Sequence, residues 1–190
     1  HVYEVKFTLN NEVKATRYAN KDGKVILPTT KDIVGEGYNP HHYYALAFGD
    51  GFSASTTITE DRQVAVTLDH KEYYEIKNKD DWKAFCDIVE SGQTSVDAKL
   101  TQDVDLGSDI VMAGRENPYN HNSFYYYTGT FDGQGHTLSF SWDAGSRNDI
   151  APFTYVKDAT IKNLRTQGKI TSKRYSLSGM VRAALGTTTI

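Results

Sequence analysis

The sequence has very little sulfur and no excess of basic charge. It contains 1 Cys, so no disulfide can form within the chain, and 2 Met. The 21 Lys and Arg are outnumbered by 24 Asp and Glu, and this balance excludes a broad basic surface for nucleic acid. There is no run of about 18 apolar residues, so we expect no membrane insertion in this segment.

What is present favours β structure. The 190 residues suit one large domain or two small ones, and the hydrophobic share of 38% is typical of sheets with one solvated face. The low cysteine content is compatible with a bacterial exported protein. No signal peptide is recognised at the start, which is His1.

The first part of the chain, residues 1–70, reads as a small β-rich domain. Apolar and polar residues alternate over residues 2–9, and the turn signals "NN" and "NKDG" follow. Further short strands are predicted at "VILP", "YYALAF", "TTIT" and "QVAVTLD". Short strands at about 10-residue intervals predict a small all-β or β-rich domain, and an immunoglobulin-like sandwich is one such fold.

One helix is predicted, near residues 79–91, and it opens the second domain, residues 71–190. An apolar stripe runs along it, and Asn78 or Asp80 can cap its start. The stripe consists of Trp82, Phe85, Cys86 and Val89. Because so short a helix does not fold alone, we expect it to lie on an apolar surface.

The rest of the chain carries a weak repeat. The segments "HTL", "ATI" and "TTI" begin at residues 136, 159 and 188, which gives a repeat of about 20 to 30 residues. If these segments align, Leu138, Ile161 and Ile190 stack on neighbouring strands. A repeated strand without a long helix predicts a right-handed parallel β-helix capped by the short helix. Because "GTTTI" stops within a rung, we also expect a longer protein.

The second domain resembles the GLUG-type β-helix module of bacterial surface proteins. The matching segments, over about residues 73–190, are "DWKAF", "LTQDVDLG", "GTFDGQGHTL", "VKDATIKNL" and "SGMVRAALGTTTI". The last of these carries the family's pattern through Ser178, Gly179, Val181 and Gly186. The resemblance implies a building block of an exposed protein, such as an adhesin, and no catalysis.

The first domain resembles the Listeria–Bacteroides repeat, a β-grasp-like module that is also found in surface proteins. The matching segments are "DGKVILP" and "TTITEDRQVAV". The two families commonly share chains. Together they imply an extracellular or cell-surface location, with the signal and the anchor outside this segment.

The glycine-rich segment "FDGQGH", which begins at Phe131, could be a phosphate loop or a corner between strands. A dinucleotide fingerprint needs a helix directly after its glycines, and strand residues follow here. Asp132 and Gly133 form an Asp-Gly pair, which is typical of a tight turn. We therefore predict a corner, with Phe131 and Leu138 buried on either side.

Several polar groups suggest a metal or a reaction, and none has the required spacing. Asp103, Asp105 and Asp109 invite a calcium interpretation, but the apolar residues between them indicate a solvated strand face. His41 and His42 point opposite ways if they lie on a strand. No carboxylate pair is singled out for glycosidic chemistry. We predict no metal, no cofactor and no catalytic residue, and a buried Cys86.

The aromatic-rich loop "ENPYNHNSFYYYTG" is the candidate ligand site. Exposed rings can stack on sugars while Asn and Ser bond to hydroxyls, although Tyr126 or Tyr127 could instead enter the core. The predicted ligand-binding residues are Tyr119, His121, Phe124, Tyr125, Tyr126 and Tyr127.

These observations favour a non-catalytic module of a bacterial cell-surface protein. Its function would be adhesion, with host or environmental glycans or surface proteins as partners. The alternatives are a carbohydrate-active β-helix enzyme, either a lyase or a hydrolase, and a purely structural stalk or spacer.

Overall fold

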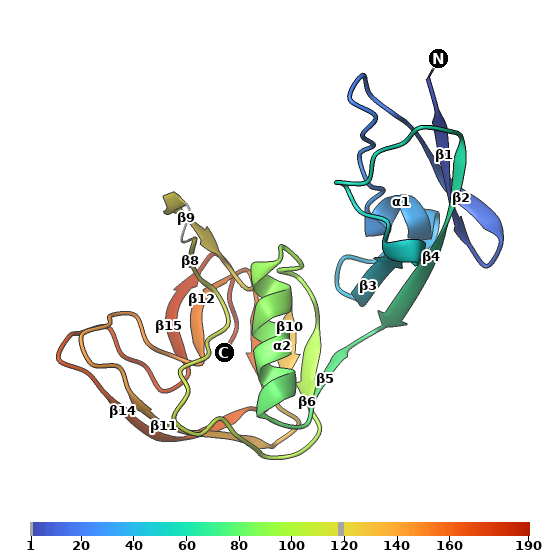
Figure 1. Ribbon diagram of the computed structural model, residues 1–190. Helices are drawn as coiled ribbons and strands as arrows, with labels where there is room; N and C mark the ends of the chain where they lie inside the picture. The colour runs from blue at the N-terminus through green and yellow to red at the C-terminus, as the bar shows by residue number, and fades with distance from the viewer. Residues whose placement is uncertain (1, 118–119) are drawn as a thin grey trace. The chain divides into compact units, whose positions relative to one another are not determined.

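A computed structural model describes residues 2–117 and 120–190, without the side chains of residues 117, 121 and 122. The chain divides into two compact units, and each has its own hydrophobic core. The first unit comprises His1–Asn39 and Tyr44–Lys71, and the second comprises Pro40–Tyr43 and Glu72–Ile190. Both units are mainly β, as the sequence predicts (Figure 1).

The first unit contains one four-stranded sheet in the order β2-β1-β4-β3. Its strands are β1 (Glu4–Leu9), β2 (Glu12–Tyr18), β3 (Tyr43–Phe48) and β4 (Arg62–Lys71). Strands β1 and β2 form an antiparallel hairpin, whereas β1 and β4 are parallel. The alternation in β1 places Val5 and Phe7 in the core, where the Phe7 ring packs edge-on against Phe48 and Phe52.

Two details of the first unit differ from the prediction. The segments "VILP" and "TTIT" are not strands, although Val25 and Ile58 are buried. A short helix that the pattern did not predict, α1 (Thr30–Val34), follows β2 instead. It begins with a capping box between Thr29 and Asp32, whose carboxylate is also 2.8 Å from Arg17. Two single 3₁₀ turns, η1 (Gly35–Gly37) and η2 (Gly49–Gly51), complete the unit.

The described part of the second unit contains one helix, α2 (Lys79–Glu90), and short strands in several sheets. The strands are β5 (Tyr74–Ile76), β6 (Ala98–Leu100), β7 (Val104–Asp105), β8 (Arg115–Asn117), β9 (Asn120–Tyr125), β10 (Thr130–Asp132), β11 (Thr137–Asp143), β12 (Phe153–Lys157), β13 (Thr160–Lys162), β14 (Arg165–Thr171) and β15 (Val181–Leu185). The sheets remain separate, and none of them closes on itself.

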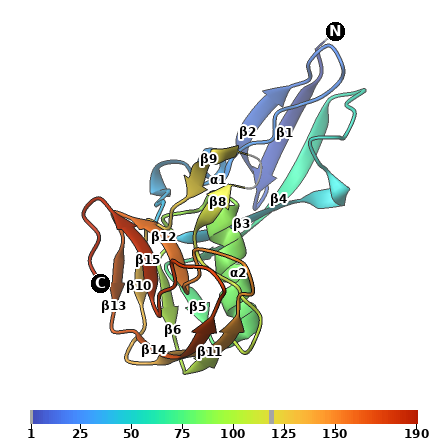
Figure 2. The same cartoon turned by 90° about the vertical axis from the view of Figure 1, so that its left-hand side faces the viewer.

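Three of these sheets are built from parallel strands. Their strand orders are β13-β10-β6-β5, β14-β11-β7 and β12-β15. In each sheet, two neighbouring strands therefore come from successive passes of the chain through that sheet, and they run in the same direction. Figure 2 shows β13, β10, β6 and β5 side by side. Antiparallel pairing in this unit, among the described residues, is confined to the β8–β9 hairpin.

The register of these ladders corrects the predicted alignment of the repeat. "ATI" and "TTI" do align, since Thr160 bridges Thr189. "HTL" does not, because Leu138 pairs with Val104 and Thr166 in a different sheet. The true partner of Ile161 is Phe131 in "GTF". Both Leu138 and Phe131 are buried, so the aliphatic residue after a Thr was a misleading guide to register.

Helix α2 covers part of the core of the second unit. Asn78 caps it by accepting a hydrogen bond from the Asp81 N–H at 2.9 Å. The predicted stripe is confirmed, because Trp82, Phe85, Cys86 and Val89 are all buried. The Trp82 ring meets Phe131 and Phe153 edge-on, and its indole N–H donates to the Val111 carbonyl at 2.9 Å. Burial of each large side chain contributes roughly 1.5–3 kcal/mol to stability.

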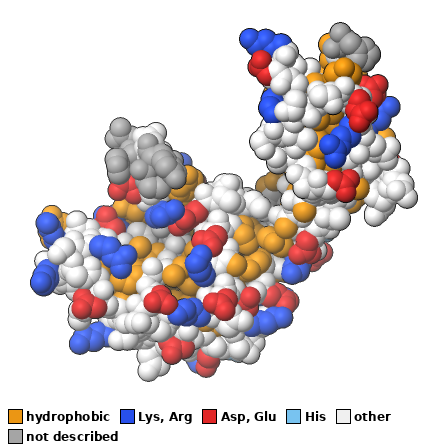
Figure 3. All heavy atoms as spheres, viewed as in Figure 1, with side chains coloured by type: hydrophobic (Ala, Val, Ile, Leu, Met, Phe, Trp, Pro, Cys, Tyr) orange, Lys and Arg blue, Asp and Glu red, His pale blue; other side chains and the backbone are white. Residues whose placement is uncertain are grey.

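No helix in the described part of the chain is long and apolar enough to cross a membrane. Charged side chains of both signs are mixed on the face of the second unit that carries α2, with hydrophobic atoms reaching the surface between them (Figure 3).

Candidate functional site

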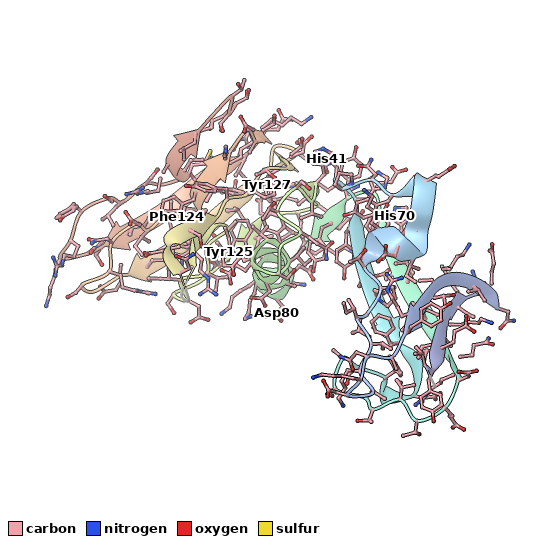
Figure 4. All side chains as sticks on the ribbon, turned by 90° about the horizontal axis from the view of Figure 1, so that it is seen from above. His41, His70, Asp80, Phe124, Tyr125 and Tyr127 are labelled. Atoms are coloured by element: carbon pink, nitrogen blue, oxygen red, sulfur yellow. The ribbon has the colours of Figure 1, made fainter. Side chains whose placement is uncertain are left out.

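The aromatic-rich loop lies on and after the β8–β9 hairpin of the second unit. Phe124 and Tyr125 belong to β9, and Tyr126 and Tyr127 follow it. Phe124, Tyr125 and Tyr127 are labelled in Figure 4. The backbone of His121 is also in β9, but its side chain lies outside the described residues, as does the whole of Tyr119. Four of the six predicted ligand residues can therefore be placed in full.

Tyr127 is a core residue, so its prediction as a ligand contact is wrong. Its side chain is 0% exposed, and its hydroxyl donates to the Val96 carbonyl at 3.0 Å. The ring packs against Phe85 and Phe153. Burial, followed by the charge of Asp97, raises the pKa of the Tyr127 hydroxyl well above its usual range. A phenol that is enclosed in this way has no surface to offer a ligand.

Phe124 and Tyr126 form an aromatic cluster with Tyr155 of β12, which we call the hairpin cluster. The Phe124 and Tyr155 ring centroids are 4.7 Å apart, and the Phe124 and Tyr126 centroids are 5.7 Å apart. Tyr126 meets Tyr155 edge-on at 6.2 Å. Phe124 and Tyr126 are each partly exposed, whereas Tyr155 is only 9% exposed. The Phe124 and Tyr126 rings are therefore partly open to solvent, and both pack against the buried Tyr155 ring.

Charged groups hold the base of the hairpin cluster. The Tyr155 hydroxyl donates to Asp149 at 3.1 Å, and Asp149 pairs with Arg182 at 2.7 Å. The Arg182 guanidinium lies over the Tyr155 ring at 5.1 Å from its centroid. Burial and the nearby Asp149 charge raise the pKa of Tyr155, so its hydroxyl stays protonated and keeps donating. Sequence reasoning missed Tyr155, Asp149 and Arg182, because they lie far from the loop along the chain.

A close backbone approach ties the hairpin to the neighbouring strands. Gly114, directly before β8, has φ 75, and a Cβ there would lie 2.9 Å from the Tyr125 carbonyl oxygen and would overlap the Tyr155 carbonyl. Only glycine fits so close a contact in this backbone conformation. The hairpin is therefore anchored at its base, and its aromatic side chains have a defined support.

The glycine-rich segment is a corner between strands, as predicted. Gln134 and Gly135 have φ values of 50 and 82, and Phe131 and Leu138 on either side are 0% exposed. The strand β11 follows, so no helix terminus faces the glycines. His136 is partly exposed, and its Nδ1 lies 3.4 Å from Asp103.

The three acidic residues considered for calcium take separate partners. Asp103 accepts a hydrogen bond from the Thr137 N–H at 2.9 Å, and Asp105 accepts one from the Gly107 N–H at 2.9 Å. Asp109 pairs with Lys79. Across residues 2–117 and 120–190, wherever side chains are described, no three His, Cys, Asp or Glu residues gather as a metal ion would require.

His41 and His42 lie in a turn before β3. They are not on a strand, so the expectation that they point opposite ways for that reason does not apply. The Nδ1 of His41 is 3.1 Å from the Ser95 carbonyl oxygen and 3.5 Å from the Asp97 carboxylate. Cys86 is buried, as predicted, and burial raises the pKa of its thiol well above its usual range. Its packing is that of a small hydrophobic side chain.

Comparison with known proteins adds no identification. No protein-family model matches the chain, and neither a curated protein nor a solved structure is significantly similar to it.

Proposed function

We propose that this chain is a non-catalytic module of a bacterial exported or cell-surface protein, and that it binds a glycan or a surface protein through the hairpin cluster. The second unit would be the start of a GLUG-type right-handed β-helix. The first unit would be a β-grasp-like domain of the Listeria–Bacteroides type.

The parallel ladders support the β-helix proposal. Successive passes of the chain pair in parallel in three sheets, and parallel connections are nearly always right-handed. The buried aromatic and aliphatic side chains of β10 and β13 are register partners, as stacked coils require. Helix α2 lies where a cap for the first coil is needed, since it contacts β5 at the sheet edge.

The sheet order of the first unit supports the β-grasp-like proposal over an immunoglobulin-like sandwich. A hairpin, a helix and two further strands give the order β2-β1-β4-β3, with the first and last strands parallel at the centre. A sandwich needs two packed sheets, and the described part of this unit has one.

The observation that carries the binding proposal is the hairpin cluster. Partly exposed Phe124 and Tyr126 rest on buried Tyr155, which Asp149 and Arg182 fix from below. Rigid aromatic rings supply contact area at a low entropic cost, and they dominate many binding surfaces. Such a platform suits the apolar face of a sugar ring or an aromatic side chain of a partner.

The test is a glycan-array screen of the whole chain with the Phe124→Ala and Tyr126→Ala variants. We expect reproducible signals that fall at least about tenfold in either variant, which corresponds to about 1.4 kcal/mol. Tyr175→Ala is the matched control, because Tyr175 is a 73% exposed tyrosine of the same unit and should not matter. Equal signals from the wild type and both variants would contradict the proposal.

A parallel assay separates binding from catalysis. The chain is incubated with polysaccharides that give array signals, with and without calcium, and the reducing ends or unsaturated products are measured. We expect no turnover above the buffer control. Reproducible turnover that a carboxylate substitution such as Asp103→Ala abolishes would overturn the non-catalytic assignment.

A further inference from the structure

The outer face of the sheet β13-β10-β6-β5 carries a groove that the hairpin cluster does not include. It encloses about 430 Å³ and is lined by side chains from the loop before β5, from β6, from β10 and from β13. The residues that matter are Tyr73, Asp97, Lys99, Asp132, Gln134 and Lys162, and we call this set the sheet groove. Its volume lies within the range of small-ligand sites.

The strand register builds the floor of the sheet groove as a row of alternating charge. Glu75 pairs with Lys99, Lys99 with Asp132, and Asp132 with Lys162, each on the next parallel strand. The neighbouring residues Ala98, Phe131 and Ile161 are buried, so the row faces outward. The polar groups are therefore spaced by the strand separation of about 4.8 Å.

The charges of this row compensate one another. Lys99 Nζ lies 3.3 Å from Glu75, and Lys162 Nζ lies 3.6 Å from Asp132. A charged ligand would meet both a partner and a like charge, so it gains little from the row. A hydroxyl group can donate to a carboxylate and accept from an ammonium group at once. The alternating row therefore matches a neutral ligand with many hydroxyls.

The carboxylates of the sheet groove are fixed in place. Asp132 Oδ1 accepts hydrogen bonds from the Gln134 N–H at 2.9 Å and from the Asn163 side chain at 3.0 Å. Asp97 Oδ1 accepts the Thr130 N–H at 2.7 Å. Each carboxylate thus presents acceptors without first having to be ordered, which reduces the entropic cost of binding.

An aromatic wall and an extension complete the groove. Tyr73 is 45% exposed, and Lys99 Nζ lies 5.2 Å from its ring centroid. A second, more open hollow shares Asp132 and Gln134 and continues over Asn163 to Arg165. The polar surface is thus elongated, with one aromatic ring at its end.

We propose that the sheet groove is a second binding site, and that it takes a neutral oligosaccharide, with a sugar ring against Tyr73 and hydroxyls on Lys99, Asp132 and Lys162. This inference shares with the proposed function only the glycan as a ligand class. Its residues come from β6, β10, β13 and the loop before β5, whereas the hairpin cluster comes from β9, β12 and their surroundings.

The test is isothermal titration of the whole chain with maltohexaose, cellohexaose, xylohexaose and mannohexaose, with hexagalacturonate as the charged comparator. We expect at least one neutral ligand to bind with Kd of about 1 mM or lower. Tyr73→Ala should weaken that binding about tenfold, whereas Tyr175→Ala should leave it unchanged. Amide shifts of Lys99, Thr130 and Gln134 should move with the titration in NMR spectra.

Each outcome decides between the two sites. Loss of binding in Tyr73→Ala but not in Phe124→Ala supports the sheet groove and leaves the hairpin cluster without a role for that ligand. The reverse result supports the hairpin cluster and overturns the sheet groove. The groove proposal also falls if none of the four neutral ligands binds, or if only hexagalacturonate does. An unchanged melting temperature in Tyr73→Ala shows that lost binding is not lost folding.

Discussion

Phe131 and Ile161 are register partners on the neighbouring parallel strands β10 and β13, and both side chains are buried. The next residues along the chain, Asp132 and Lys162, are also partners, and they line the outer face. One register thus decides both what lies in the core and which charges meet in the sheet groove.

Tyr127→Phe tests the reassignment of Tyr127 from the surface to the core. Removal of the hydroxyl leaves the Val96 carbonyl without its buried donor, so we expect a loss of about 1–3 kcal/mol in the free energy of unfolding. Urea denaturation measures it. Tyr175→Phe, at an exposed tyrosine, should change little. Equal stability of both variants would contradict the core assignment.

Gly168→Ala tests the close contact between β14 and β11. Gly168 has φ 153, and a Cβ there would overlap the Phe140 carbonyl oxygen. Strain and overlap together should lower the free energy of unfolding by about 3 kcal/mol or more. Gly179→Ala is the control, because its nearest neighbour would be the Thr166 Oγ1 at 3.9 Å. If both variants unfold at the same urea concentration, the pairing of these strands is wrong.

Asn78→Ala removes the cap of α2. The side-chain oxygen of Asn78 accepts the Asp81 N–H, so its loss should destabilise the second unit by about 1 kcal/mol. Asn78→Asp keeps the acceptor and adds a negative charge at the N-terminus of the helix, and it should retain the wild-type stability. Thermal unfolding followed by far-UV circular dichroism compares the three proteins. A stable Asn78→Ala variant would show that the cap contributes nothing.

Asp132 should contribute to acid sensitivity. Partial burial, which opposes ionisation, is outweighed by hydrogen bonds from Asn163 and the Gln134 N–H and by the charge of Lys162, so the pKa of Asp132 is lowered. A carboxyl whose folded-state pKa is depressed stabilises the protein above its ordinary pKa of 3.8, and that contribution is lost as the pH falls through the lower, folded-state value.

The Asp132→Asn variant isolates this effect, because an amide oxygen can still accept both hydrogen bonds. The urea midpoints of the two proteins are compared at about pH 6 and about pH 3. The wild type should lose more stability between these values than the variant. Identical losses would mean that Asp132 is not more acidic in the folded state.

The sequence was informative where local chemistry decides the structure. Helix α2 follows from its apolar stripe and its Asn78 cap. Turn chemistry correctly indicated a corner after Phe131, but the turn itself lies at Gln134 and Gly135, one step beyond the Asp132-Gly133 pair. The short helix α1 escaped prediction because its single turn is too brief to show periodicity, although Thr29 and Asp32 carry the capping box that could have revealed it.

Register and long-range contacts could not be predicted in the same way. The segments "HTL" and "ATI" look alike in sequence, but they are not register partners. Ile161 pairs with Phe131 instead, because the packing of buried side chains decides the register and a short sequence similarity does not. The support of the hairpin cluster by Tyr155 and Arg182 depends on another long-range pairing, between β12 and β15. One sequence signal could have located the sheet groove. A charged residue follows each aligned core residue, in "AK", "FD" and "IK".

The parallel register of β10 and β13 is the claim on which the β-helix proposal and the sheet groove depend, and backbone NOEs in a ¹⁵N,¹³C-labelled sample of the whole chain measure it directly. We predict interstrand NOEs that connect Phe131 with the residues around Ile161, in the pattern of parallel strands. NOEs that place Ile161 beside Leu138 instead, or an antiparallel pattern between β10 and β13, would contradict the account.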